Sequence, residues 1–104
     1  MGIFIVIKFL MEQIFHACDI GNPCNDYENY ISWAALLSFE FDQQAQIERQ
    51  RGMEVTESFI YHDYSTLYKD QVWFLGNIVH PIWKQISFVF PTLTAYSDQV
   101  ERNL

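Results

Sequence analysis

The residues best suited to chemistry lie in a polar segment that follows an apolar amino-terminal stretch. Asp19 comes directly after this stretch, with His16 three residues before it and Asn22 three residues after it. A carboxylate beside apolar surface is costly unless a metal ion or a set of backbone donors compensates it. Asp and Asn also commonly cap the turns of their own loop. Spacing alone leaves a metal site and a capped turn open, and favours the capped turn.

The composition excludes several classes of function. The chain has 104 residues, a net charge of −7, 50% hydrophobic residues and 17% aromatic residues, which allows one small domain at most. Without a basic stripe to neutralise phosphates, we expect no nucleic-acid binding, and anionic membranes are disfavoured for the same reason. The two cysteines, Cys18 and Cys24, match neither a disulfide framework nor a CxxC pair. Two buried thiols in a reducing cytoplasm is the simplest interpretation.

The apolar stretch over residues 3–11 raises the question of a membrane segment. It is about half of the ~20 residues that a spanning helix needs, Lys8 interrupts it, and Glu12 closes it. No positive residue precedes it and no small-residue cleavage site follows it, so a signal peptide is disfavoured. We therefore expect no membrane span and a buried core helix here, with membrane tethering as the weaker alternative.

The elements that position the polar residues are all predicted to be helices. Apolar residues recur at three- and four-residue spacing over residues 3–17, 30–51 and 66–88, which is typical of amphipathic or buried helices. Gly52 should end the second helix, and Pro81 should bend the third. Residues 19–29 and 53–65 read as loops. A further short helix is expected over residues 98–102 of the polar tail, and the expected fold class is all-α.

Two dense motifs carry a resemblance to a known family. The sequence HACDIGNP at residues 16–23 resembles the H-[AC]-[AC]-D-[LI]-[SG]-N-P signature of the class I 3′,5′-cyclic-nucleotide phosphodiesterase catalytic domain. Downstream, residues 28–33 and 40–44 are similar to its E-x-Y-x-x-W and E-F-[FW]-x-Q patterns, and DQVWF followed by IVHPIW over residues 70–83 is similar to [SD]-Q-V-G-F and I-V-x-P-L-[WF]. About residues 10–90 carry the resemblance, with residues 91–104 as a tail. It implies the carboxyl-terminal part of a multi-helix catalytic domain.

The resemblance implies a role for five residues. Asp19 would be a metal ligand and Asn22 a polar contact to the nucleotide, while Gln71 would present its amide to the purine edge. Phe74 and Leu37 would press on the two faces of the base. The chemistry agrees, because a side-chain amide has both a donor and an acceptor and positions three apart share a helix face. Without the resemblance, Gln71 would be an ordinary solvent-facing residue, and Phe74 and Leu37 ordinary core residues.

The family resemblance also identifies groups that the 104 residues do not supply. The family's H-N-x-x-H motif and its second metal-binding Asp are not found among the 104 residues, and a catalytic zinc needs three protein ligands and an open position. The resemblance implies two divalent ions, Zn and Mg or Mn, but we expect an incomplete site, no catalytic residue in this chain and little activity from the chain alone. His62-Asp63 is interpreted as a coincidental match to the family's HD dipeptide, and Trp73 replaces a small residue beside Gln71.

The expected function is therefore hydrolysis of cAMP or cGMP to the 5′-monophosphate in signal transduction, with the cyclic nucleotide as partner. The alternative is a non-catalytic helical module that binds a nucleotide or another protein. The sequence leaves the choice between cAMP and cGMP open, because it does not identify what holds the Gln71 amide.

Overall fold

The computed structural model describes residues 2–104, and all of its regular structure is helical. No strand occurs within these residues, so the expected all-α class is confirmed. The five α-helices are α1 (Gly2–Asp19), α2 (Tyr27–Gln50), α3 (Tyr64–Phe74), α4 (His80–Val89) and α5 (Thr94–Asn103). Short 3₁₀ turns are η1 (Asn22–Cys24), η2 (Glu57–Phe59) and η4 (Pro91–Leu93), and η3 (Leu75–Val79) is a π-helical turn.

Helix α2 matches the predicted amphipathic helix closely. It begins three residues earlier than expected because Asp26 caps it: the backbone N–H of Asn29 donates to Asp26 Oδ1 at 2.9 Å. It ends where Gly52 adopts φ +68°, a backbone conformation that glycine adopts without steric cost. The predicted helix end at Gly52 is confirmed.

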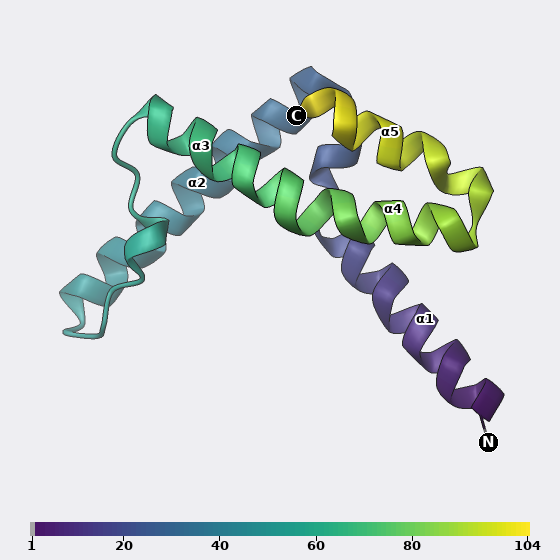
Figure 1. The fold of residues 1–104 in the computed structure, drawn as a ribbon. Helices are drawn as coiled ribbons and strands as arrows, with labels where there is room; N and C mark the ends of the chain where they lie inside the picture. Colours follow the sequence, from purple (N-terminus) through teal and green to yellow (C-terminus); the bar gives the residue numbers. More distant parts are fainter. Residues whose placement is uncertain (1) are drawn as a thin grey trace.

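The third predicted helix is instead a rod of three segments, α3, η3 and α4, drawn in greens in Figure 1. The expected bend at Pro81 stays a prediction, and the change in hydrogen-bond register lies just before this residue. The irregularity comes before it, where the His80 N–H donates to the Leu75 carbonyl in the wide π-helical register. Pro81 then lies in the first turn of α4, where its missing N–H is tolerated.

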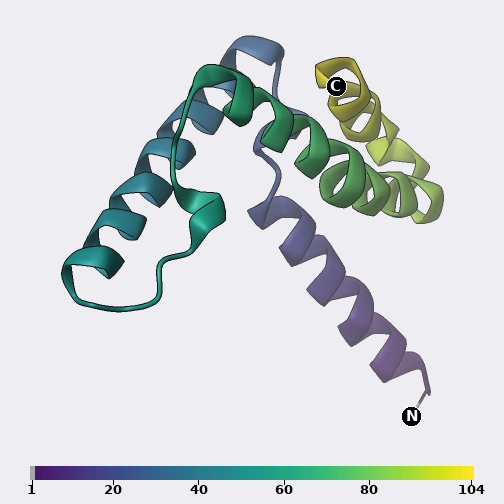
Figure 2. The same cartoon turned by 60° about the vertical axis from the view of Figure 1, so that its left-hand side comes forward.

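The polar tail forms a longer helix than the predicted residues 98–102, and α5 runs back along α4 in both ribbon views (Figures 1 and 2). Together with the ends of α1 and α2, these helices bury the core. Its residues are Ala17, Tyr30, Ala34, Leu75, Val79, Trp83, Ile86 and Val100. The core therefore lies where α1, α2, η3, α4 and α5 meet.

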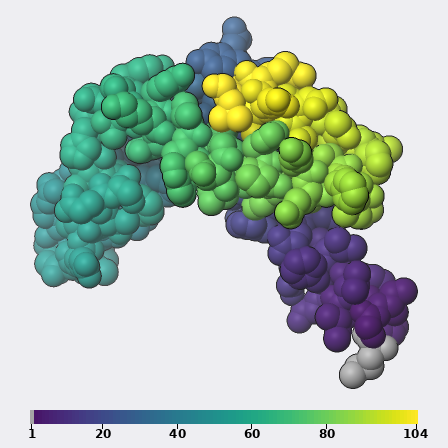
Figure 3. All heavy atoms as spheres, viewed as in Figure 1, coloured from purple at the N-terminus to yellow at the C-terminus, as the bar shows by residue number. Residues whose placement is uncertain are grey.

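Helix α1 contradicts the expectation of a helix buried on most sides. Only Ala17 of α1 is buried, and the helix projects away from the other elements in Figures 1, 2 and 3. Its exposed large apolar side chains are between 46% and 75% exposed: Ile3, Phe4, Ile5, Val6, Ile7, Phe9, Met11 and Phe15. The Cα radius of gyration is 16.3 Å, whereas a compact domain of about 100 residues has about 13 Å. The physical reason is that no other helix or turn among residues 2–104 covers these side chains.

The same geometry bears on the apolar stretch and on the two thiols. Among residues 2–104, no helix combines the length and the apolar character needed to cross a membrane. The two thiols are not both buried: Cys18 is exposed and Cys24 is half-buried. Burial, followed by the neighbouring Cys18, raises the pKa of Cys24 to about 11, so its thiol stays protonated at neutral pH.

Gly21 allows the chain to turn sharply after α1, and this gives a first testable prediction. A Cβ at position 21 would lie 2.9 Å from the Cys18 carbonyl oxygen, a backbone atom that cannot easily move. We expect Gly21→Ala to lower the free energy of unfolding by about 1–3 kcal/mol, the usual cost of forcing extra atoms into a packed site, as measured by urea denaturation. Gly76→Ala is the control, because its nearest atom is 3.8 Å away. Equal urea concentrations at the midpoint of unfolding for Gly21→Ala and Gly76→Ala would contradict the prediction.

Candidate functional site

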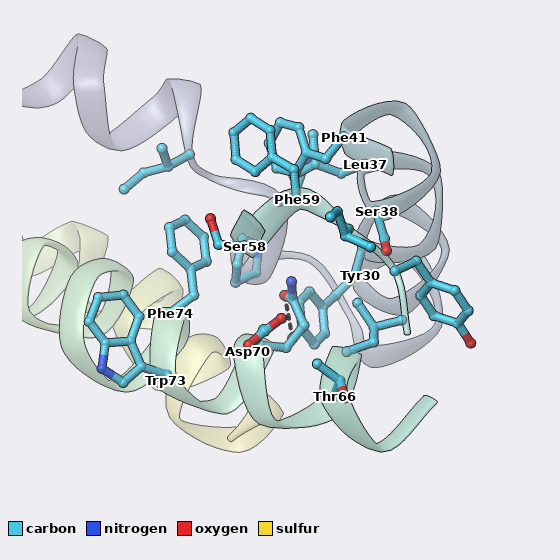
Figure 4. A pocket seen from close by; sticks show the side chains of 18 of the residues that line it. Tyr30, Leu37, Ser38, Phe41, Ser58, Phe59, Thr66, Asp70, Trp73 and Phe74 are labelled. Carbon is cyan, nitrogen blue, oxygen red and sulfur yellow. Dashed lines mark hydrogen bonds between the residues drawn. The ribbon is translucent and has the colours of Figure 1, made fainter. Parts of the chain in front are cut away.

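A cavity of about 590 Å³ opens between α2, α3 and the connector that joins them (Figure 4). Its volume is within the range of small-molecule sites, about 300–1,000 Å³. Apolar and aromatic side chains dominate its wall, with a few polar groups among them. The lining residues are Asp19, Ile20, Asn22, Pro23, Tyr30, Ala34, Leu37, Ser38, Phe41, residues 58–62, Thr66, Leu67, Asp70, Gln71, Trp73 and Phe74.

All five predicted site residues line this one cavity. Asp19 and Asn22 come from the end of α1 and the turn after it, Leu37 comes from α2, and Gln71 and Phe74 come from α3. Asp19 is exposed, whereas the other four are half-buried. The segments that meet here are up to 55 residues apart in sequence, from Asp19 to Phe74, so only the fold brings them together.

Tyr30 fixes the orientation of the Gln71 side chain. The Tyr30 hydroxyl donates to Gln71 Oε1 at 3.0 Å, shown as a dashed line in Figure 4. Tyr30 is only 3% exposed, and burial, followed by nearby Tyr27 and Tyr68, raises its pKa to about 12. The hydroxyl therefore remains a donor at neutral pH. One lone pair of Gln71 Oε1 and both hydrogens of Nε2 stay available for a ligand.

The sequence did not identify Tyr30 as the residue that holds this amide. It is 41 residues from Gln71, and nothing local to α3 indicates the contact. A signal was present, since Tyr30 is the tyrosine of the E-x-Y-x-x-W pattern, but that pattern gives it no partner.

The connector between α2 and α3 also covers part of the cavity, although it reads from sequence as a loop of turns. Phe59 stacks on Phe41 with ring centroids 4.2 Å apart and an interplanar angle of 7°, as Figure 4 shows. The backbone of the connector is hydrogen-bonded to α2 near both of its ends. The Thr56 N–H donates to Glu48 Oε2 at 2.9 Å, and the Tyr61 N–H donates to Asp42 Oδ1 at 3.0 Å. These bonds hold the connector in place as one wall of the cavity.

Three side chains that were given no firm role can now be placed. His62 and Trp73 line the cavity, and the Trp73 indole is 60% exposed beside Phe74 at its edge (Figure 4). His16 is exposed on α1 and does not line the cavity.

Asp63, which follows His62, caps α3. Its Oδ1 accepts a hydrogen bond of 2.7 Å from the Thr66 N–H, and this bond lowers the pKa of Asp63. Capping is thus the role that the structure gives Asp63.

The described residues do not form a complete metal site. Within residues 2–104, no three His, Cys, Asp or Glu side chains are grouped closely enough to hold an ion. Asp19 supplies one exposed carboxylate at the cavity, and a catalytic zinc needs three protein ligands. The residues present therefore fit part of a metal site and not the whole.

Comparisons with known proteins agree on one family. The sequence model of the 3′5′-cyclic nucleotide phosphodiesterases matches residues 5–100. Two curated relatives from Drosophila melanogaster are named 3′,5′-cyclic-AMP phosphodiesterase, one of them isoform F; each is 35% identical over 95 residues, or 90% of this chain. The chain spans 14% of the length of isoform F and 9% of the other relative.

A solved structure shares the fold. The phosphodiesterase domain of the RhoPDE fusion protein from the choanoflagellate Salpingoeca rosetta superposes with a TM-score of 0.85 and 28% sequence identity. The match covers 92% of this chain and 30% of that one. The all-α arrangement is thus that of a part of a phosphodiesterase domain, and the chain belongs to the 3′5′-cyclic nucleotide phosphodiesterase family.

Proposed function

We propose that this chain forms the nucleotide-binding part of a phosphodiesterase catalytic domain that hydrolyses a cyclic nucleotide to its 5′-monophosphate. The observation that carries the proposal is the convergence of Asn22, Leu37, Gln71 and Phe74 on one cavity, with the Gln71 amide held by Tyr30. The names of the Drosophila relatives support cAMP as a substrate. A cytoplasmic location is part of the proposal and is consistent with two free cysteines.

In this proposal the base lies between Phe74 and Leu37, with its edge against Gln71. Aromatic stacking of a base contributes about 1–3 kcal/mol, which is substantial in a cavity whose lining contains neither Lys nor Arg. Gln pairs with adenine by accepting from its amino group and donating to N7. The lone pair and the amide hydrogens that Tyr30 leaves available are those that this pairing uses. The N1–H and O6 of guanine can use the same lone pair and hydrogens, so the expected preference for adenine, and for cAMP over cGMP, rests on the names of the Drosophila relatives.

The metal ions and the proton donor for hydrolysis would depend on residues outside those described. In this proposal Asp19 contributes one carboxylate to a site for divalent ions, and further helices of the catalytic domain contribute the other ligands. The exposed apolar side chains of α1 support this arrangement, because helices packed over α1 would bury them. Zn and Mg or Mn are the ions that the family resemblance suggests.

Binding of cAMP to the 104-residue chain tests the cavity without requiring hydrolysis. We expect Gln71→Ala to weaken cAMP binding by roughly 5- to 150-fold, since a good bidentate contact to a base contributes about 1–3 kcal/mol, as measured by isothermal titration calorimetry. Tyr30→Phe keeps the ring but removes the bond to Gln71 Oε1, so it should narrow the preference for cAMP over cGMP.

Gln43→Ala is the matched control for this experiment. Gln43 is an exposed glutamine of α2 that does not line the cavity. Equal loss of cAMP binding in Gln43→Ala and Gln71→Ala, or no loss in Gln71→Ala, would sink the proposed site.

A further inference from the structure

The turn that follows Asp19 and carries Asn22 into the cavity is held by a residue from the opposite end of the chain. The two hydrogens of Asn103 Nδ2 are donated to two backbone carbonyls of this turn, Pro23 O and Asn25 O, each at 2.8 Å. Asn103 is in the last turn of α5, which packs against η1. The contact joins residues 78 and 80 positions apart.

The Asn103 amide is itself held in a fixed orientation. Gln99 Nε2 donates to Asn103 Oδ1 at 3.2 Å, and Arg102 Nη2 donates to Gln99 Oε1 at 2.7 Å. Asn103 is half-buried, so water competes less for its bond from Gln99 than it would at an exposed site. Both donors and one acceptor position of the amide are thus in use.

The turn has little internal support of its own. The η1 turn contains three residues, and Pro23 has no N–H to donate. Its internal bonds are Cys24 N–H to Gly21 O at 2.9 Å, Asn25 N–H to Asn22 O at 3.1 Å and Asn25 Nδ2 to Asn22 O at 3.0 Å. A single 3₁₀ turn is among the segments that open most readily. Bonds from outside the turn therefore add to how firmly Asn22 is fixed.

We propose that Asn103 is a positioning residue for the cavity: it clamps the turn over residues 20–25 so that Asn22 and Asp19 keep their places in the cavity wall. Only the expected effect of Asn103 on cAMP binding rests on the proposed function. The clamp itself is a property of the free protein. Nothing in the family motifs at residues 16–23 or 70–83 points to position 103.

The experiment compares two variants of Asn103 with a variant of the same helix. Asn103→Leu keeps a similar volume without the donors, and Asn103→Asp keeps the shape but faces the two carbonyl oxygens with a carboxylate. Val100→Ala is the control, because Val100 is fully buried in α5 yet makes no bond to the turn. Each variant is studied at a temperature at which it is at least 95% folded.

The first readout is hydrogen exchange of the Cys24 and Asn25 amides by nuclear magnetic resonance. Loss of two hydrogen bonds should raise their exchange about tenfold or more in both Asn103 variants relative to α4 amides, and Val100→Ala should show no such selective change. Unchanged exchange at Cys24 and Asn25, or an equal selective rise in Val100→Ala, would overturn the clamp.

The second readout is the dissociation constant for cAMP, which should rise severalfold in the Asn103 variants. If the exchange rises but the affinity does not, while Gln71→Ala still loses binding, the positioning role of Asn103 is overturned and the proposed function stands. If the native chain binds no cAMP, the proposed function fails, and the exchange rates alone decide whether Asn103 holds the turn.

Discussion

The 104-residue chain alone is expected to leave cAMP intact, and to take part in its hydrolysis only together with a polypeptide that supplies the rest of a phosphodiesterase catalytic domain. The described residues group no three metal-binding side chains, and hydrolysis at a two-metal centre depends on ions that clamp the attacking and leaving oxygens. Enzymes accelerate such reactions by at least about 10⁶-fold. The rate of cAMP hydrolysis by the chain together with such a polypeptide should therefore exceed the rate of the chain alone by more than 10³-fold.

The experiment mixes the chain with the part of the Salpingoeca rosetta phosphodiesterase domain that it does not match, in the presence of zinc and magnesium, and measures the release of 5′-AMP. Phe4→Glu tests whether the exposed face of α1 is the contact, because Phe4 is 75% exposed and its loss should not unfold the free chain. Gln43→Glu places the same charge on an exposed position of α2.

Phe4→Glu should abolish the joint activity and Gln43→Glu should preserve it. Hydrolysis of cAMP by the chain alone would show that it carries a complete centre and would overturn the prediction. Binding of cAMP without hydrolysis in any mixture would favour the alternative function, a nucleotide-binding module.

The second large effect is expected at Asp19 in the joint enzyme. Replacing Asp19 by Asn keeps the size of the side chain but removes the charge that attracts a divalent ion. Loss of a residue that only orients a metal ligand costs 10- to 100-fold, so loss of a ligand should lower kcat by about 10²-fold or more and reduce the bound zinc, measured by atomic absorption. Asp98→Asn, at an exposed position of α5, is the control. Full zinc content in Asp19→Asn would remove Asp19 from the metal site.

The sequence predicts the local structure well where a helix has its own signals. The four-residue apolar spacing and Gly52 locate the end of α2, and the left-handed φ of Gly52 supplies the physical reason. The start of α2 and the π-helical turn over Leu75–Val79 were missed. The first depends on a cap at Asp26 and the second on a change of hydrogen-bond register before Pro81, and neither changes the apolar pattern.

The long-range parts of the site are harder to predict. The family motifs identify the five residues that meet in the cavity, but not Tyr30 or Asn103 as the residues that hold Gln71 and the turn, because these bonds join positions 41 and 78–80 residues apart. The apolar pattern of α1 indicates that it should be covered, but not by what. The roles of the five residues in binding stay predictions.

Tyr30 belongs to two parts of the protein at once. Its ring is a member of the buried core, and its hydroxyl reaches the cavity and holds Gln71. Conformations in which the core loosens should therefore also lose the cavity, so a ligand of the cavity binds only the folded molecules. Binding and folding are then thermodynamically linked: a ligand at one hundred times its dissociation constant stabilises the native state by about 2.7 kcal/mol. For a chain with so much uncovered apolar surface, the concentration of its ligand would help to set the fraction that is folded.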